Sequence, residues 1–226
     1  MPERKSLRYT EPGFREPSGL LKAALGIFIA AAVLGVWSTW LELEVLARLA
    51  AGDEVAEAEV LASDSRQVMV VNLYVLALLF CGAAYLRWVF LVTRNARALE
   101  LDFRHTPAAM VLWYLIPVAN LWQPYRTMVD LFQASDPQAS AGETGTRPTG
   151  LLEGWWALWL LTLVSVGLGF GLSFAAETLP AYMQASRMLL IAFGGSVVSG
   201  ALTLIVVIML NARQETLWRR QKRPGR

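Results

Sequence analysis

The chain has 226 residues, of which 55% are hydrophobic and only 17% charged, and its formal net charge is +2. A soluble domain of this length keeps a larger charged surface, so the composition excludes an ordinary soluble globular protein and indicates a membrane protein. With one cysteine (Cys81) and one histidine (His105), the chain can form no intramolecular disulfide and has no Cys or His cluster for a metal site.

Residues 1–18 are polar and rich in proline and basic residues, and we expect them to form a disordered cytoplasmic tail. A cleaved signal peptide is the competing interpretation. The polar lead is long, and the apolar run that follows exceeds the usual hydrophobic region of a signal peptide, which favours a retained tail.

Four long apolar runs predict an all-α integral membrane protein with four transmembrane helices. A run of about 20 residues crosses roughly 30 Å of hydrocarbon at about 1.5 Å per residue. We expect one membrane domain over residues 19–212, in which the first helix continues past the bilayer and ends at Gly52. The predicted spans are residues 20–42, 68–93, 154–175 and 188–211, with approximate bounds.

The distribution of lysine and arginine predicts the topology. Five basic residues lie before or just inside the first span, five in residues 94–153 and six after the fourth span, whereas the 43–67 and 176–187 connections hold two and one. Basic residues favour the cytoplasmic side. All three basic segments share that side only if the chain crosses four times, so we expect a bacterial inner-membrane protein with both termini in the cytoplasm.

The segment 107–133 is apolar enough for a bilayer, yet it is interrupted by Pro117, Asn120 and Pro124. A full crossing would put the basic carboxyl-terminal tail outside, and each proline removes a backbone donor from a helix. We therefore predict a re-entrant or interfacial element on the cytoplasmic side: a short helix near 107–116, a turn, and an amphipathic helix that begins near Pro124. A flexible linker, residues 134–152, follows it, and residues 213–226 form a basic cytoplasmic tail.

A family resemblance rests on this central segment. The motif runs Trp113-Tyr114-x-Ile116-Pro117-x-x-Asn120-Leu121-x-x-Pro124-Tyr125, followed by Asp130 and Ala134-Ser135-Asp136-Pro137, with Arg87-Trp88, Arg94-Asn95-Ala96 and Gly154-Trp155-Trp156 outside it. Over roughly residues 45–212 the chain resembles a bacterial multi-pass membrane family, domain of unknown function 4328. Asp130 stands where the resemblance implies glutamate. The resemblance implies several membrane spans and no particular reaction.

The polar residues of the central segment form the candidate site. The Asn120 amide either caps a helix or satisfies carbonyls freed by the two prolines, or it binds an ion or substrate at a helix break, as in transporters. Arg126 and Asp130 are four residues apart and can pair on the solvated face of the second helix, which also carries Tyr125 at its start. Arg87 either extends toward lipid headgroups or pairs with a polar group of the central segment.

Small residues at four-residue spacing predict close packing between the third and fourth spans. Without side-chain bulk on one face, two helix backbones approach each other closely. A seam between two copies of the chain is the alternative. The residues concerned are Gly167 and Gly171 in the third span, and Gly195, Ser196, Ser199 and Gly200 in the fourth.

Several other features have simple structural interpretations. We expect Trp155, Trp156 and Trp159 to belong to an interfacial aromatic belt, although stacking on a ligand is the alternative. The basic tail suits anionic headgroups better than nucleic acid, so we expect no nucleic-acid partner. His105 lies in a charged loop, and we expect it to be exposed rather than to relay protons.

No catalytic constellation, metal-ligand spacing or phosphate-binding loop is recognisable, so we expect neither an enzyme nor a cofactor. The sequence favours a structural, interaction or lipid-contacting module whose partners are membrane lipids, and it leaves open a protein partner or a homo-oligomer. The alternative is a small channel or transporter with its site near Asn120.

Overall fold

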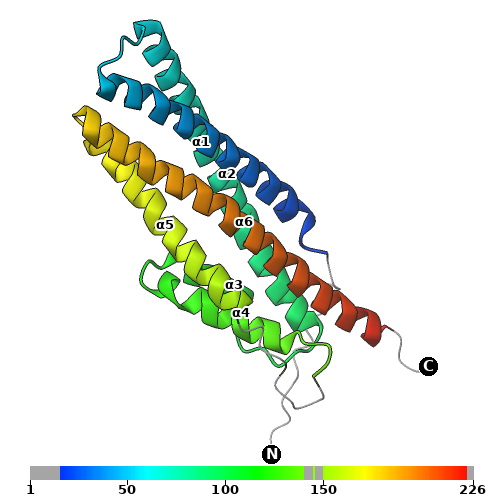
Figure 1. Cartoon of the computed structure of the whole chain (residues 1–226). Helices are drawn as coiled ribbons and strands as arrows, with labels where there is room; N and C mark the ends of the chain where they lie inside the picture. The colour runs from blue at the N-terminus through cyan, green and yellow to red at the C-terminus, as the bar shows by residue number, and fades with distance from the viewer. Residues whose placement is uncertain (1–15, 140–144, 146–149, 223–226) are drawn as a thin grey trace, which may run out of the picture.

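The computed structural model describes residues 16–139, 145 and 150–222, and its regular elements are all helical (Figure 1). Residues 1–15, 140–144, 146–149 and 223–226 lie outside the described residues. They include most of the predicted amino-terminal tail, part of the predicted linker and the end of the predicted basic tail. Four long helices are long and apolar enough to cross a membrane, which confirms the four predicted spans. They are α1 (Gly19–Ala51), α2 (Glu57–Ala98), α5 (Leu151–Ala175) and α6 (Leu179–Gln221), and the short elements between them are α3 (Pro107–Leu115), the 3₁₀ turn η1 (Ala119–Leu121) and α4 (Gln123–Ala134).

Local sequence sets several of these helix ends. Gly52 has a φ of 83°, and its N–H bonds to the Leu49 carbonyl while Asp53 N–H bonds to the Arg48 carbonyl. This is a Schellman motif, in which glycine takes the left-handed conformation at no steric cost, so the predicted stop at Gly52 is confirmed. Threonine caps α3 and α6: Thr106 Oγ1 accepts from Ala109 N–H at 3.1 Å, and Thr178 serves α6 in the same way.

The long helices form an open bundle in which α5 packs along α6, α6 along α1, and α1 along α2. Figure 1 shows the 52–56 and 176–178 connections together at one end, here called the loop end. The start of α1, the end of α2, the start of α5 and the end of α6 lie at the other, here called the terminal end, as do α3 and α4. The described parts of the three basic segments therefore share one end of the bundle, as a chain with four crossings requires.

The helices are longer than the predicted spans. Residues 213–221, predicted as part of a cytoplasmic tail, continue α6 as a regular helix. They stay helical because they pack on the end of α2: Gln214 Nε2 donates to the Val92 carbonyl at 3.0 Å, and Gln221 Nε2 donates to the Leu99 carbonyl at 2.9 Å. Tertiary hydrogen bonds thus extend the helix where hydropathy no longer predicts one.

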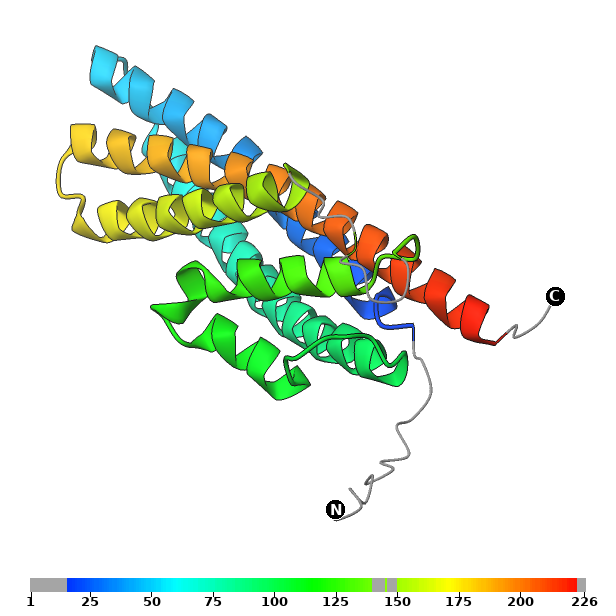
Figure 2. The ribbon, with the colours of Figure 1, turned by 90° about the horizontal axis from the view of Figure 1, so that it is seen from below.

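Pro117 ends α3, as the sequence indicates. The preceding residue, Ile116, has an extended ψ of 112°, because a following proline disfavours the helical conformation. Residues 119–121 form the single 3₁₀ turn among the described residues, and α4 begins with Pro124 in its first turn, where the missing N–H costs nothing. The predicted helix–turn–helix is therefore present, and Figure 2 shows α3 and α4 alongside α2.

The apolar face of α4 covers protein. Met128, Leu131 and Phe132 are fully buried in the core cluster that α2 and α6 also form. Arg213 of α6 fixes the end of α4: its Nη1 donates to the Phe132 carbonyl at 2.8 Å, and its guanidinium lies 5.5 Å from the centre of the Phe132 ring. A cation at a helix carboxyl terminus also offsets the helix dipole. The predicted amphipathic helix exists, but its apolar side faces the bundle rather than a membrane surface.

Candidate functional site

A cavity of about 290 Å³ lies inside the bundle, between α2 and α5. It arises because α2 and α5 are not among the pairs of long helices that pack closely, so a space remains between them, with α1 and α6 behind it and α3 across it near the terminal end. The rim residues Leu78, Leu115 and Leu163 are 39%, 61% and 48% exposed. Because these rim residues are exposed on the outside of the bundle, the cavity opens sideways.

The lining follows helical periodicity. On α2 it consists of residues such as Tyr74, Leu78, Cys81 and Tyr85, which recur at spacings of three and four and so share one face. The α5 lining shows the same spacing. Its members are Trp155, Trp159, Thr162, Leu163 and Val166, and Trp156 joins them.

Aromatic side chains build the part of the cavity nearest the terminal end. The hydroxyls of Tyr85 on α2 and Tyr114 on α3 are 2.9 Å apart, and the two rings meet edge to face at 5.4 Å. The Trp156 ring lies 6.4 Å from Tyr114 and stacks on Trp159 at 4.7 Å. Trp156 also donates its Nε1–H to the Leu121 carbonyl at 3.0 Å, which joins α5 to η1. One aromatic cluster thus connects α2 and α3 to α5, across the space that separates α2 from α5.

Two buried hydrogen bonds join α2 and α5 to α6, which forms the back of the cavity. Tyr74 and Ser196 hydroxyls are 2.8 Å apart, and Trp155 Nε1 donates to Thr203 Oγ1 at 3.0 Å. Ser196 and Thr203 in turn donate to carbonyls of α6 four residues earlier, each at 2.8 Å. Each polar group in these two chains has a partner, as burial in an apolar environment requires. Trp155 and Trp156 are 1% and 6% exposed, so the structure places them inside the bundle and not in an exposed aromatic belt.

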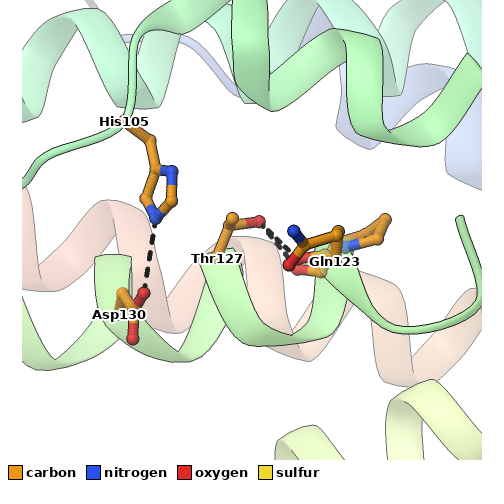
Figure 3. Close-up of polar contacts among 5 residues, drawn as sticks. His105, Gln123, Thr127 and Asp130 are labelled. Atoms are coloured by element: carbon orange, nitrogen blue, oxygen red, sulfur yellow. Dashed lines mark hydrogen bonds and ion pairs between the residues drawn. The ribbon is translucent and has the colours of Figure 1, made fainter. Parts of the chain in front are cut away.

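The Asn120 side chain does not cap α4. Trp122 is the residue before α4, no side chain caps that end, and Asn120 Oδ1 is buried with no hydrogen-bond partner among the described residues. Carbonyls near the break are satisfied by other groups: Trp156 donates to one of them, and Thr127 Oγ1 donates to the Gln123 and Pro124 carbonyls at 2.9 and 3.1 Å (Figure 3). The expected cap by Asn120 is therefore absent at the start of α4, and these two side chains contact the nearby carbonyls instead.

The other central residues lie apart from the cavity. Pro117 is exposed, whereas Pro124 is buried. The partner of Asp130 is His105, at 3.4 Å, and not Arg126, because the loop before α3 brings His105 over α4 (Figure 3). The Tyr125 hydroxyl donates to Glu153 Oε1 at 3.4 Å, which joins α4 to the start of α5.

Arg87 is exposed on α2, and no ion pair involves it among the described residues. It follows Leu86, which lines the cavity, by one residue, or about 100° around the helix. The rotation about the helix axis that separates Arg87 from Tyr85 and from Leu78 is larger still. Arg87 therefore lies on the face of α2 that points away from the cavity. This position agrees with a side chain that extends toward headgroups and does not place Arg87 against the central segment.

The small residues pack, but in a different pattern from the predicted one. Gly167 and Gly171 have open space where a Cβ would be, so they do not form the contact with α6. Gly169 does: its Cβ would lie 2.8 Å from Leu189 Cδ2. On α6, Gly195 faces Thr162 of α5, whereas Gly200 faces Ile29 of α1. The predicted packing of the third span on the fourth occurs, through Gly169 and Gly195. Ser196 and Ser199 are buried beside the cavity.

Sequence reasoning missed the cavity residues Tyr74, Tyr85 and Thr162. A detectable signal was present, because tyrosines inside apolar spans carry a hydroxyl that needs a buried partner. The sequence could not show that Tyr85 would meet Tyr114, since the two belong to different helices. Among the described residues no group of three or more His, Cys, Asp or Glu side chains is placed to hold a metal ion.

Comparison with known proteins gives one match. The model of a family described as domain of unknown function (DUF4328) matches residues 51–212, which include α2 through most of α6 and therefore most of the cavity lining. No curated protein and no solved structure matches the chain.

Proposed function

Because the chain belongs to this DUF4328 family and has four helices fit to span a membrane, we propose that it is a non-catalytic lipid-binding module. In this proposal the cavity between α2 and α5 holds one hydrocarbon chain of a membrane lipid. The observation that carries the proposal is the sideways opening of an apolar cavity within four helices that are long and apolar enough to span a bilayer.

The size of the cavity suits a single chain. At about 30 Å³ for each water-sized group, 290 Å³ has room for about ten such groups, and a methylene is of similar size. The rim residues Leu78, Leu115 and Leu163 are apolar, so a chain that enters from the bilayer leaves no polar group without a partner at the rim.

The physical reason for occupancy is packing rather than release from water. Lipid tails are as apolar as leucine, so the hydrophobic effect does not drive a chain from bilayer to cavity. An empty apolar space of this volume loses dispersion contacts along its whole lining, and a chain that fills it restores them. Lipid chains are the apolar groups present in excess around membrane-spanning helices, which makes them the natural occupant.

We also propose a location in a bacterial inner membrane, with the terminal end of the bundle in the cytoplasm. The support is the positive-inside rule together with the shared end of the basic segments. With this orientation α3, η1 and α4 lie on the cytoplasmic side, and α3 closes the cavity from that side.

The alternative function, a small channel or transporter with its site near Asn120, is favoured by one observation. Asn120 Oδ1 is a buried acceptor without a donor among the described residues, as expected of a group that receives a hydrogen bond from a ligand. Asn120 is not among the residues that line the cavity, so a site there is separate from the one proposed here.

Filling the cavity tests the proposal. Gly82 lines it and has open space where a Cβ would lie, so Gly82→Leu places four carbons in the cavity mouth without a clash at the Cβ. Gly171→Leu is the matched control, because Gly171 is exposed on α5, has similar open space and does not line the cavity. Lipid retained after mild detergent extraction is counted by native mass spectrometry.

We expect the wild-type protein and Gly171→Leu to retain about one lipid per chain, and Gly82→Leu to lose most of it. The proposal fails if the wild type retains no lipid above the level of bulk detergent exchange, or if Gly82→Leu retains as much as Gly171→Leu. Melting temperatures of the three proteins confirm that each is folded.

A further inference from the structure

We infer that the bound chain is a fatty acyl ester, whose carbonyl oxygen accepts a hydrogen bond from the Tyr85–Tyr114 hydroxyl pair, with Thr162 as a second unpaired donor on the cavity wall. This inference rests on the proposed lipid-binding function and adds the chemical class of the ligand. It follows from counting the hydrogen-bond donors that line the cavity and finding which of them lack an acceptor.

The tyrosine pair has one hydroxyl hydrogen more than it uses. A phenolic hydroxyl carries one hydrogen, so the two hydroxyls hold two, and the 2.9 Å contact between them consumes one. Neither Tyr85 nor Tyr114 makes a second hydrogen bond within the described residues. Both side chains line the cavity, so one O–H group is available to a cavity occupant.

Thr162 supplies a second donor. Its Oγ1 is buried, lies against Gly195 and has no hydrogen-bond partner among the described residues. Other hydroxyls on these helices donate to the carbonyl four residues earlier: Ser165 and Ser173 of α5 do so at 2.8 Å. Thr162 lacks this local bond, and it lines the cavity about 9 Å further along α5 than Trp156, at 1.5 Å per residue.

Several other polar groups of the cavity wall are already paired. Tyr74 donates to Ser196, because Ser196 uses its own hydrogen on the Ala192 carbonyl. Trp155 donates to Thr203, which donates to the Ser199 carbonyl. The two unpaired donors belong to different walls of the cavity, the tyrosine pair to α2 and α3 and Thr162 to α5.

These donors select a neutral acceptor. A plain alkyl chain would leave both hydroxyls without partners in an apolar environment, which is unfavourable. A carboxylate would satisfy them, but it brings a charge into a site without a cation among its lining residues. A lipid hydroxyl brings a further hydrogen that needs its own acceptor. An ester carbonyl accepts through two lone pairs, adds no donor and is attached directly to a long apolar chain.

The test uses two probes of equal length, the methyl ester of a saturated fatty acid and the methyl ether of the matching alcohol. The ether lacks the carbonyl oxygen. Their occupancies on the protein in mild detergent are compared by native mass spectrometry under competition. We expect the wild-type protein to prefer the ester about fivefold, the effect typical of one net hydrogen bond.

Variants assign the preference to the named groups. Tyr85→Phe combined with Tyr114→Phe removes both hydroxyls, and we expect it to bind the two probes about equally. Each single variant leaves one hydroxyl with its hydrogen free, so we expect it to keep most of the preference. Tyr74→Phe is the matched control, since the Tyr74 hydroxyl is already paired with Ser196, and it keeps the preference. Thr162→Val conserves shape, and we expect it to keep most of the preference, because the tyrosine pair is the donor to the carbonyl.

The possible failures are distinguishable. Equal binding of ester and ether by the wild type, with both lost in Gly82→Leu, overturns this inference and leaves the lipid-binding proposal intact. No binding of either probe by the wild type overturns the lipid-binding proposal itself. An ester preference that survives removal of both tyrosine hydroxyls also overturns the inference.

Discussion

Replacing Gly35 by alanine tests how tightly α1 packs on α6. A Cβ at this position would lie 2.7 Å from two atoms of the Phe193 ring and 2.9 Å from a third. Carbon atoms pack at about 3.5–4.0 Å, so the ring must retreat by about 1 Å. It has little freedom to do so, because Phe193 is 1% exposed and meets Tyr74 edge to face at 4.9 Å. Overpacking of this kind typically costs about 1–3 kcal/mol.

Gly26 provides the matched control within the same helix. It is exposed, and nothing lies within 4 Å of a Cβ built on it. In a membrane the helices persist in the unfolded state, since their backbone groups have no other partners, so the higher helix propensity of alanine largely cancels between the two states. We therefore expect Gly26→Ala to leave stability nearly unchanged.

Thermal unfolding in a mild detergent measures both variants against the wild type. A chain of this size shifts its melting temperature by about 2–4 °C for each kcal/mol, so Gly35→Ala should melt about 2–12 °C lower. The reasoning is refuted if Gly35→Ala and Gly26→Ala melt at the same temperature, because the contact between Gly35 and Phe193 would then not exist as described.

The terminal end of the bundle and its contacts give three further predictions. Asn120→Leu should leave the melting temperature unchanged or raise it, because it removes a buried acceptor without a partner; a loss of about 1–3 kcal/mol would instead support the capping role. Arg213→Met should loosen the end of α4 and speed protease cleavage in the segment that follows it, and unchanged cleavage would show that the hydrogen bond to the α4 carbonyl is dispensable. In a cysteine-free background, single cysteines at Gln138 and Lys222 should react with an impermeant thiol reagent from the same membrane face, and one at Glu54 from the opposite face. Labelling of Gln138 and Lys222 from opposite faces would refute the shared terminal end.

The proline-broken segment shows how far local rules reach. Backbone properties of single residues explain three helix ends. Helix α3 ends before Pro117, α4 begins around Pro124, and α1 ends at Gly52. These properties act within a few residues, so they can be read from the chain directly. The partner of the Leu121 carbonyl at the break is Trp156, which arrives from a different helix, so no local rule could place it there.

The glycines show a second limit to what the sequence can predict. A four-residue spacing correctly indicates that α5 and α6 pack closely, yet it selects Gly167 and Gly171, which are open, and overlooks Gly169, which makes the contact. The rotation of a helix about its own axis depends on its neighbours. Apolar periodicity does not reveal that rotation in a membrane protein, because lipid and protein interior are equally apolar.

The sequence by itself determined the four helical spans, their principal ends and the sharing of one end by the basic segments, because length, hydropathy and capping are local properties. Only the tertiary structure decided that α2 and α5 stay apart, and that Tyr85 and Tyr114 meet beside the resulting cavity. The physical reason is that a cavity belongs to no single segment: its walls come from five helices, and its volume depends on how their side chains fit together.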